Sequence, residues 1–280
     1  MSTIRTFFLM AALTLLLILV GQAIGGQQGA FFFFILSLMM NFIMYWFSDK
    51  IVLKMYRAKE VSQPEAPELH DIVRRLTAKA QMPMPKVYII PQDAPNAFAT
   101  GRNPQHAAVA VTAGIMRLLD REELEGVLGH ELAHVKNRDV LTATIAASMA
   151  GAIMMLARMA GWSMMFGGMG GRDRDDRGGG GLGVLVMAIV APLAAMLIQM
   201  AISRSREYAA DIGGAQLAKP LALANALQDL DNYTKRIPME VNPSTAHMFI
   251  VNPLSAKGIV HLFSTHPPIQ ERIKRLRAMA

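Results

Sequence analysis

The chain has 280 residues, of which 52% are hydrophobic and only 18% are charged, and it contains no cysteine. This composition is typical of a membrane protein with a soluble part; it excludes disulfides and restricts any zinc site to histidine and carboxylate ligands. The net charge of +7 comes from Lys and Arg residues scattered outside the long apolar segments, with no aromatic-basic motif or phosphate loop, so a membrane surface is favoured over nucleic acid.

Two apolar segments near the N-terminus, 6–24 and 30–47, contain no charged residue and are separated by Gly-Gly-Gln-Gln-Gly at 25–29. Each is long enough to cross a hydrocarbon core of about 30 Å, so together they predict a transmembrane hairpin. Positive charges flank the hairpin but are absent from its turn, which predicts that both ends lie in the cytoplasm. A cleaved signal peptide is the alternative for the first segment. The flanking charges are Arg5, Lys50, Lys54, Arg57 and Lys59.

Residues 91–114 predict a loop that leads into a short strand at 107–112. In zinc proteases an exposed strand beside the metal-binding helix holds the substrate extended through main-chain hydrogen bonds. The segment 107–112 is predicted to be that edge strand because it is short, has small side chains and lies close in sequence to the metal motif described next.

A capping-box pattern at Asp120 and Glu123 opens a predicted helix that carries His-Glu-x-x-His. His130 and His134 are four residues apart, so both imidazoles project from one helix face and can bind one tetrahedral zinc ion. Glu131 is placed to take a proton from a zinc-activated water. The motif is short, and an ordinary histidine pair on a helix is the alternative.

Two further apolar segments, 141–157 and 178–203, flank a loop with three Arg and three Asp at 172–177. They predict a second transmembrane hairpin that enters and leaves on the cytoplasmic side. Buried core helices or partial insertion are the alternative. Glu131 and Leu141 are ten residues apart, so a continuous helix would place Glu131 about 15 Å from the membrane segment.

The third zinc ligand is expected outside the motif, because Val140 stands where the metzincin pattern has a histidine. Glu207 is favoured because it lies four residues after the fourth apolar segment ends, and Asp211, one helical turn later, is predicted to orient a ligand imidazole. The alternative is that Glu207 pairs with Arg204 or Arg206 at a membrane boundary. The candidate downstream glutamates are Glu207, Glu240 and Glu271.

Four separated motifs occur in an order that resembles the HtpX family of membrane-bound zinc proteases of bacteria. They are the N-terminal apolar hairpin, GHELAHVKNRD at 129–139, SREYAAD at 205–211 after the second apolar pair, and STHPPIQERI at 264–273. The resemblance covers nearly the whole chain. It implies an endopeptidase of the bacterial inner membrane, multi-pass and with its active site facing the cytoplasm, that degrades misfolded or damaged membrane proteins under stress.

The same resemblance implies one zinc ion per chain, with His130, His134 and Glu207 as its ligands and Glu131 as the general base. The bilayer and misfolded membrane proteins are the expected partners, and nucleic acid is not. A non-proteolytic membrane scaffold or chaperone is the alternative function, and a transporter fits less well because the apolar segments contain at most Arg158.

Two other residues have two interpretations each. The block Asn96-Ala97-Phe98-Ala99 recurs near the site in the resembling family, so Asn96 is expected to donate to a substrate carbonyl or oxyanion, or to form an Asx turn after Pro95. His266 precedes a predicted helix with an apolar stripe. It is either a capping or packing residue, or it points into the cleft as a donor or as a fourth zinc ligand in a resting state.

The predicted architecture is a mainly α membrane protein with four transmembrane helices and a zincin-like α+β protease domain that has a short edge strand. The expected boundaries are an N-terminal transmembrane hairpin at 1–48, the first part of the cytoplasmic protease domain with the motif helix at 49–139, a second transmembrane hairpin with its Gly-rich loop at 140–203, and the second part of the protease domain with the third zinc ligand at 204–280.

Overall fold

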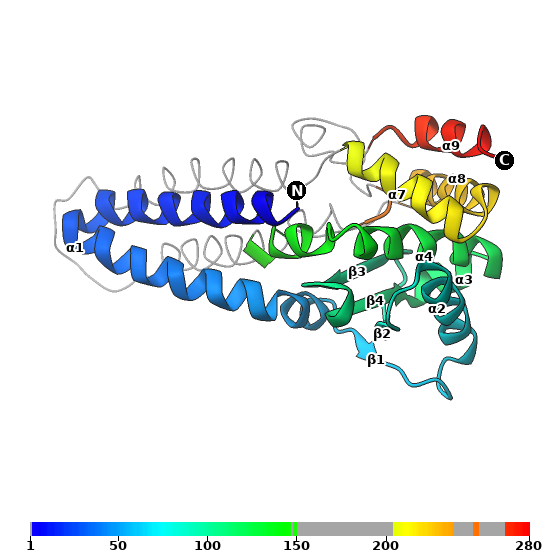
Figure 1. Cartoon of the computed structure of the whole chain (residues 1–280), viewed down its shortest axis with the longest axis horizontal. Helices are drawn as coiled ribbons and strands as arrows, with labels where there is room; N and C mark the ends of the chain where they lie inside the picture. The colour runs from blue at the N-terminus through cyan, green and yellow to red at the C-terminus, as the bar shows by residue number, and fades with distance from the viewer. Residues whose placement is uncertain (1, 147, 150–203, 238–248, 252–266) are drawn as a thin grey trace, which may run out of the picture.

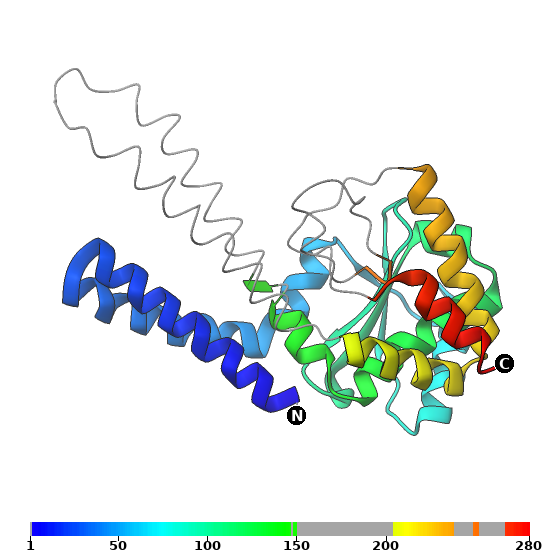
Figure 2. The ribbon, with the colours of Figure 1, turned by 90° about the horizontal axis from the view of Figure 1, so that it is seen from above.

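The first element of the computed structural model is α1, which spans Ser2–Met55. The structure describes residues 2–146, 148–149, 204–237, 249–251 and 267–280. Helical geometry in α1 is interrupted at Gly25 and Gly26, and the φ of +58° at Gly26 is one that glycine adopts without a steric penalty. The chain reverses there, so α1 is a hairpin of two helical arms (Figure 1, Figure 2). The turn predicted at 25–29 is confirmed.

The two arms of α1 are in close contact near the turn and share a polar contact further along. A Cβ atom at Gly21 would lie 2.5 Å from the carbonyl oxygen of Gly29, so glycine is needed for the observed approach. Asn41 in the second arm donates to Thr14 Oγ1 at 2.9 Å and to the Met10 carbonyl at 3.3 Å in the first. Small residues and interhelical amide bonds are the usual means by which apolar helices associate in lipid.

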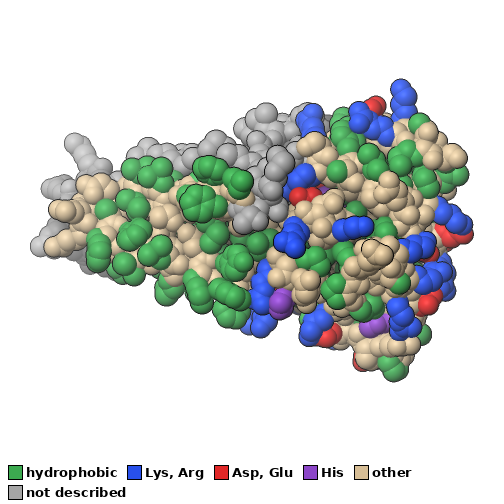
Figure 3. Space-filling view, viewed as in Figure 1, with side chains coloured by type: hydrophobic (Ala, Val, Ile, Leu, Met, Phe, Trp, Pro, Cys, Tyr) green, Lys and Arg blue, Asp and Glu red, His purple; other side chains and the backbone are tan. Residues whose placement is uncertain are grey.

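One helical stretch in the described residues, Gly25–Met55, is long and apolar enough to cross a membrane, with a mean hydropathy of 1.9. The first arm contains a shorter apolar helix, Thr6–Leu19. Figure 3 shows hydrophobic side chains spread over both arms, whereas charged side chains gather on the rest of the molecule. Of the four predicted transmembrane helices, one is therefore supported by its length and hydropathy. Most of the second predicted hairpin lies outside the described residues.

Four strands form one sheet in the order β1-β2-β4-β3. The inner pair, β2 and β4, is parallel, and the two outer strands pair antiparallel with them. The strand predicted at 107–112 is confirmed as β4, but its expected place at the edge is wrong. β4 is interior and fully buried, and β3 is the edge strand beside the motif helix. The bounds are β1 Lys59–Glu60, β2 Lys86–Ile90, β3 Ala97–Gly101 and β4 Ala107–Thr112.

The motif helix α4, Arg121–Lys136, lies at the centre of the soluble part. It contacts β3, α2, α7 and α8, and Figure 1 shows the sheet on one side of it and α7 and α8 on the other. Apolar side chains on several of its faces, including Val127, Leu128 and Leu132, are fully buried in the main core. The other helices are α2 Pro67–Ala80, α3 Ala113–Leu118, α7 Arg204–Leu217, α8 Pro220–Arg236 and α9 Ile269–Arg277, with a 3-10 turn at Pro104–His106.

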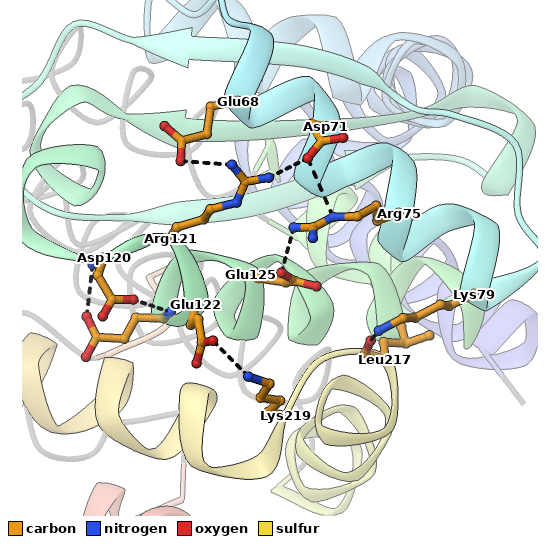
Figure 4. Close-up of polar contacts among 11 residues, drawn as sticks. Glu68, Asp71, Arg75, Lys79, Asp120, Arg121, Glu122, Glu125, Leu217 and Lys219 are labelled. Atoms are coloured by element: carbon orange, nitrogen blue, oxygen red, sulfur yellow. Dashed lines mark hydrogen bonds and ion pairs between the residues drawn. The ribbon is translucent and has the colours of Figure 1, made fainter.

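The N-terminal end of α4 is fixed as predicted. Asp120 accepts from the Glu123 backbone N–H while the Glu123 carboxylate accepts from the Asp120 N–H, so the capping box is confirmed. Ion pairs then join α4 to its neighbours, as Figure 4 shows: Arg121 contacts Glu68 and Asp71 on α2, and Glu122 contacts Lys219 before α8. Exposed pairs are individually weak, but together they limit how α4 can rotate or slide.

The predicted continuation of α4 into the third apolar segment is wrong. α4 ends at Lys136, and Arg138 adopts a left-handed conformation with a φ of +59° before helical structure resumes at 140. The break redirects the chain toward α1, where Thr142 Oγ1 lies 2.8 Å from Thr6 Oγ1. Asp139, directly after the break, lies 3.6 Å from His134 Nδ1 through its Oδ2 atom.

Candidate metal centre

His130, His134 and Glu207 converge between α4 and α7. The Nε2 atom of His130 lies 3.8 Å from Glu207 Oε2, and that of His134 lies 3.5 Å from Glu207 Oε1. One ligand atom from each residue falls within 4.8 Å of the others, so the group could hold a metal ion. The structure thus brings together the two motif histidines and the glutamate that sequence reasoning selected from a distant segment.

Glycine makes this convergence feasible, because α4 and α7 approach backbone to backbone. A Cβ atom at Gly214 would lie 2.7 Å from the His130 amide nitrogen and 2.8 Å from its Cα. On the facing helix, a Cβ at Gly129 would lie 3.1 Å from the Gly214 carbonyl oxygen. A glycine inside a helix is about 1 kcal/mol less favourable than alanine. The two glycines therefore lower the stability of α4 and α7, but they permit the short distance between the two backbones at which Glu207 reaches the histidines.

Gly214→Ala is expected to lower the free energy of unfolding by about 1–3 kcal/mol and to weaken zinc binding, because α7 must move away from the backbone of His130. Gly129→Ala is the matched comparison, since its nearest contact of 3.1 Å requires a smaller shift of α7 than the 2.7 Å contact at Gly214, and the added methyl favours helix. Thermal unfolding and a zinc competition titration would measure both. Equal behaviour of the two variants would contradict the close-approach argument.

The donor set fits zinc. Two imidazole nitrogens and one carboxylate form the three-ligand pattern of a hydrolytic zinc site that keeps a fourth position open. Ligand atoms placed about 2.0–2.1 Å from a tetrahedral ion lie about 3.4 Å apart, close to the 3.5 Å and 3.8 Å observed between the histidine nitrogens and Glu207. Because all three ligand atoms lie within 4.8 Å of one another, the widest pair would have to approach by up to about 1.4 Å to bind the ion.

Each histidine has a carboxylate at its other ring nitrogen. The Nδ1 atom of His130 lies 3.0 Å from Asp211 Oδ1, although the direction of the N–H is poor for a hydrogen bond. The Nδ1 atom of His134 lies 3.6 Å from Asp139 Oδ2, just beyond the break in α4. Carboxylates in this position orient a metal-binding imidazole and select the tautomer with a free Nε2. Asp211 was predicted in this position; Asp139 was not.

The charges around the cluster favour a cation. Burial by itself would lower the pKa of His134, but Asp139, Glu207 and Glu131 together outweigh it and raise that pKa. Burial would likewise oppose ionisation of Asp211, yet the charge and hydrogen bonds of Arg272 and the nearby His130 ring lower the pKa of Asp211 to about 2. The carboxylates that raise the pKa of His134 also favour a divalent ion at the cluster, and the low pKa of Asp211 keeps that carboxylate ionised beside His130.

Glu131 connects the cluster to the edge strand. Its side chain is largely buried, and Oε2 accepts a hydrogen bond of 3.0 Å from the backbone N–H of Ala99 in β3. The carboxylate therefore lies between the motif helix and the edge strand.

The remaining predicted residues differ in how far the structure describes them. Asn96 is buried just before β3, and its Oδ1 accepts from the Ile250 N–H at 3.4 Å, so its role toward a substrate stays a prediction. His266 and Glu240 lie outside the described residues. Glu271 is partly exposed on α9 and bonds Arg275 instead of joining the cluster.

Sequence reasoning missed two polar residues that contact the predicted site. Asp139 stands at the end of the GHELAHVKNRD motif, and a carboxylate one turn beyond the second histidine was the available signal. Arg272 on α9 is 1% exposed and bonds both oxygens of Asp211. The available signal was its spacing: Arg272 is three residues after Ile269 and four before Leu276, so it lies on the apolar face of α9, unlike the other basic residues of that helix.

A model of peptidase family M48 matches residues 63–280. The chain belongs to peptidase family M48. Two relatives are each named "Protease HtpX homolog". The one from Desulfatibacillum aliphaticivorans is 63% identical, and the match covers 98% of this chain and 89% of the relative. The one from Thermodesulfovibrio yellowstonii is 62% identical, and the match covers 100% of this chain and 99% of the relative. The resemblance to HtpX proteases is thereby confirmed, and the chain is a metallopeptidase.

The M48 chain also resembles a solved structure in fold. The match to S. mikatae Ste24p has a TM-score of 0.55 at 17% sequence identity and covers 98% of this chain and 65% of the other. At this identity the likeness concerns the fold alone. It extends over nearly the whole M48 chain.

Proposed function

We propose that this M48 metallopeptidase is a zinc-dependent endopeptidase with His130, His134 and Glu207 as ligands and Glu131 as general base. The observation that carries the proposal is the convergence of three ligand atoms within 4.8 Å of one another, with Glu131 on the same helix. Zinc, when bound, acidifies a water and polarises the peptide carbonyl. Glu131 accepts the water proton and later delivers a proton to the leaving nitrogen.

The edge strand β3 is the proposed substrate platform, since an extended chain can pair with the edge of a sheet. All five residues of β3 are buried and the Ala99 N–H donates to Glu131, so a substrate would have to displace that contact. Two ring contacts join β3 and the residue after it to the end of α1, one at Tyr56 directly after the helix and one at Trp46 inside it. The rings of Phe98 and Tyr56 lie 5.2 Å apart, and the guanidinium of Arg102, just after β3, lies 4.5 Å from the Trp46 ring centre. Because aromatic residues at the end of an apolar helix favour the membrane interface, a chain leaving the bilayer could reach β3 directly.

The proposed substrates are misfolded or damaged membrane proteins, which expose extended segments next to the bilayer. This proposal rests on the connection of β3 to α1 and on the exposed apolar surface of both arms. It requires no continuous helix from the motif into the membrane.

The purified full-length chain is expected to cleave an unfolded protein such as casein, to lose this activity when a chelator removes its metal, and to regain it with added zinc. Fragment analysis by mass spectrometry would locate the cuts within the substrate chain. Cleavage by protein shown to be metal-free would contradict the proposed function, and binding of casein without cleavage would favour a scaffold.

We propose that the soluble part faces the cytoplasm of a bacterial inner membrane, with the turn of α1 on the opposite side. Because the chain has no cysteine, Gln27→Cys and Lys274→Cys give two single probes at exposed positions. A membrane-impermeant maleimide is expected to label the first in cells with an intact cytoplasmic membrane and the second only after permeabilisation. The reverse pattern would show an inverted topology.

A further inference from the structure

Arg272 on α9 is 1% exposed although it carries a permanent charge. The other basic residues of α9 are exposed, while Ile273 and Leu276 pack into the main core. Withdrawing a guanidinium from water is strongly unfavourable unless both its charge and its N–H donors are matched. The groups around Arg272 therefore indicate why a charged residue occupies this face of the helix.

Arg272 is matched on both sides of its guanidinium. Its Nε donates to Asp211 Oδ2 at 2.9 Å and its Nη2 donates to Asp211 Oδ1 at 2.7 Å, so the pair is bidentate. Its Nη1 donates to the carbonyl of Ile250 at 3.0 Å. A planar fork with two parallel bonds fixes the plane of a carboxylate as well as its position, which a single point charge does not.

The carboxylate that Arg272 fixes is the one that faces His130. The same Oδ1 atom of Asp211 accepts from Arg272 Nη2 and lies 3.0 Å from His130 Nδ1. The chain of contacts thus runs from α9 through Asp211 on α7 to His130 on α4, whose Nε2 faces Glu207. All of the side chains in this chain are more than nine-tenths buried, so water does not substitute readily for any of them.

We propose that Arg272 is a positioning residue for the metal centre. Acting through Asp211, it holds the His130 imidazole in the tautomer and orientation that present Nε2 to the ion. The inference rests on the proposed function, because it assumes that His130 binds metal. The C-terminal helix α9 would thus support zinc binding, because its Arg272 orients the His130 imidazole through Asp211.

A purely structural role, in which Arg272 only fastens α9 to α7, makes a different prediction. Arg275 provides the matched control for that role. It lies on the same helix, its guanidinium stacks 3.9 Å from the ring centre of Tyr208 on α7, and it bonds Glu271. Arg275 therefore also joins α9 to α7 but has no bond to Asp211 among the described contacts.

The test measures zinc affinity of the purified full-length chain by competition with a chromophoric chelator, alongside thermal unfolding of the metal-free protein. Arg272→Gln is expected to weaken zinc binding about 10–100-fold, the range for loss of a partner that orients a ligand. Arg272→Lys should restore part of the affinity, and Arg275→Gln should match the parent chain. In the Asp211→Asn background, Arg272→Gln should cause no further loss, because its effect passes through Asp211.

The proposal would be overturned if a folded Arg272→Gln variant bound zinc as tightly as the parent chain. It would also be overturned if the losses of zinc affinity caused by Arg272→Gln and Asp211→Asn multiplied in the double variant. If Arg272→Gln does not fold, the double variant with Asp211→Asn still tests the proposal, because it leaves no unpaired buried charge. A zinc affinity equal to that of Asp211→Asn alone would support the positioning role, and a lower zinc affinity would refute it. Failure of the parent chain to bind zinc would instead refute the proposed metal centre.

Discussion

Glu131→Gln is expected to reduce peptide hydrolysis on the order of 10²–10⁴-fold, the usual contribution of a general base, while zinc remains bound. The substitution is nearly isosteric. Its amide oxygen can still accept the Ala99 N–H that now bonds Glu131 Oε2 at 3.0 Å, so the contact between α4 and β3 is preserved. An amide cannot accept the proton of the attacking water, and the chemical step alone is lost.

The measurement pairs a casein cleavage assay with metal analysis of the same preparation. Glu122→Gln is the matched control, since Glu122 lies on the same helix and pairs at the surface with Lys219; it should keep parent activity. Full activity in Glu131→Gln would remove the general base from the mechanism. Loss of zinc together with activity would instead mean that Glu131 supports the metal site.

Glu207→Gln is expected to weaken zinc binding by at least 100-fold, more than the loss of an orienting partner, because a neutral amide replaces an anionic ligand. The effect is visible in thermal stability. Zinc at a hundredfold excess over Kd adds about 2.7 kcal/mol to the free energy of unfolding, whereas at a concentration equal to Kd it adds about 0.4 kcal/mol. At one fixed zinc concentration the parent chain should therefore gain far more stability than the variant.

Glu271→Gln is the control for this comparison. It is the other described glutamate among the sequence candidates, and it bonds Arg275 on α9 away from the cluster. Its zinc-induced stabilisation should equal that of the parent chain. Equal stabilisation of Glu207→Gln and the parent would exclude Glu207 as a ligand, and the third donor would then have to come from elsewhere in the chain.

The elements predicted correctly from sequence are those set by nearby residues. The turn of α1 follows from two glycines between apolar segments, and the start of α4 follows from Asp120 and Glu123, which bond within one helical turn. His130 and His134 face one side of α4 because four residues nearly complete a turn. In each case, the interacting groups are neighbours in the chain, so their geometry hardly depends on the rest of the fold.

Features that depend on packing were missed or misplaced. The strand at 107–112 was recognised, but its place beside β2 and β3 results from pairing between distant segments. Likewise, the break at Arg138 interrupts a sequence that favours helix. Its left-handed turn brings Asp139 within 3.6 Å of His134, a contact that appears only when both residues are placed in space.

The sequence by itself determined the chemistry of this protein: which side chains could bind zinc, which could act as the base, and that apolar helices adjoin them. Only the tertiary structure decided that β3 is the strand at the edge and that Arg272 stands behind Asp211. The physical reason is that chemical type and helical spacing are local properties, whereas a buried charge pair or a strand neighbour forms between segments whose meeting depends on the whole packed core.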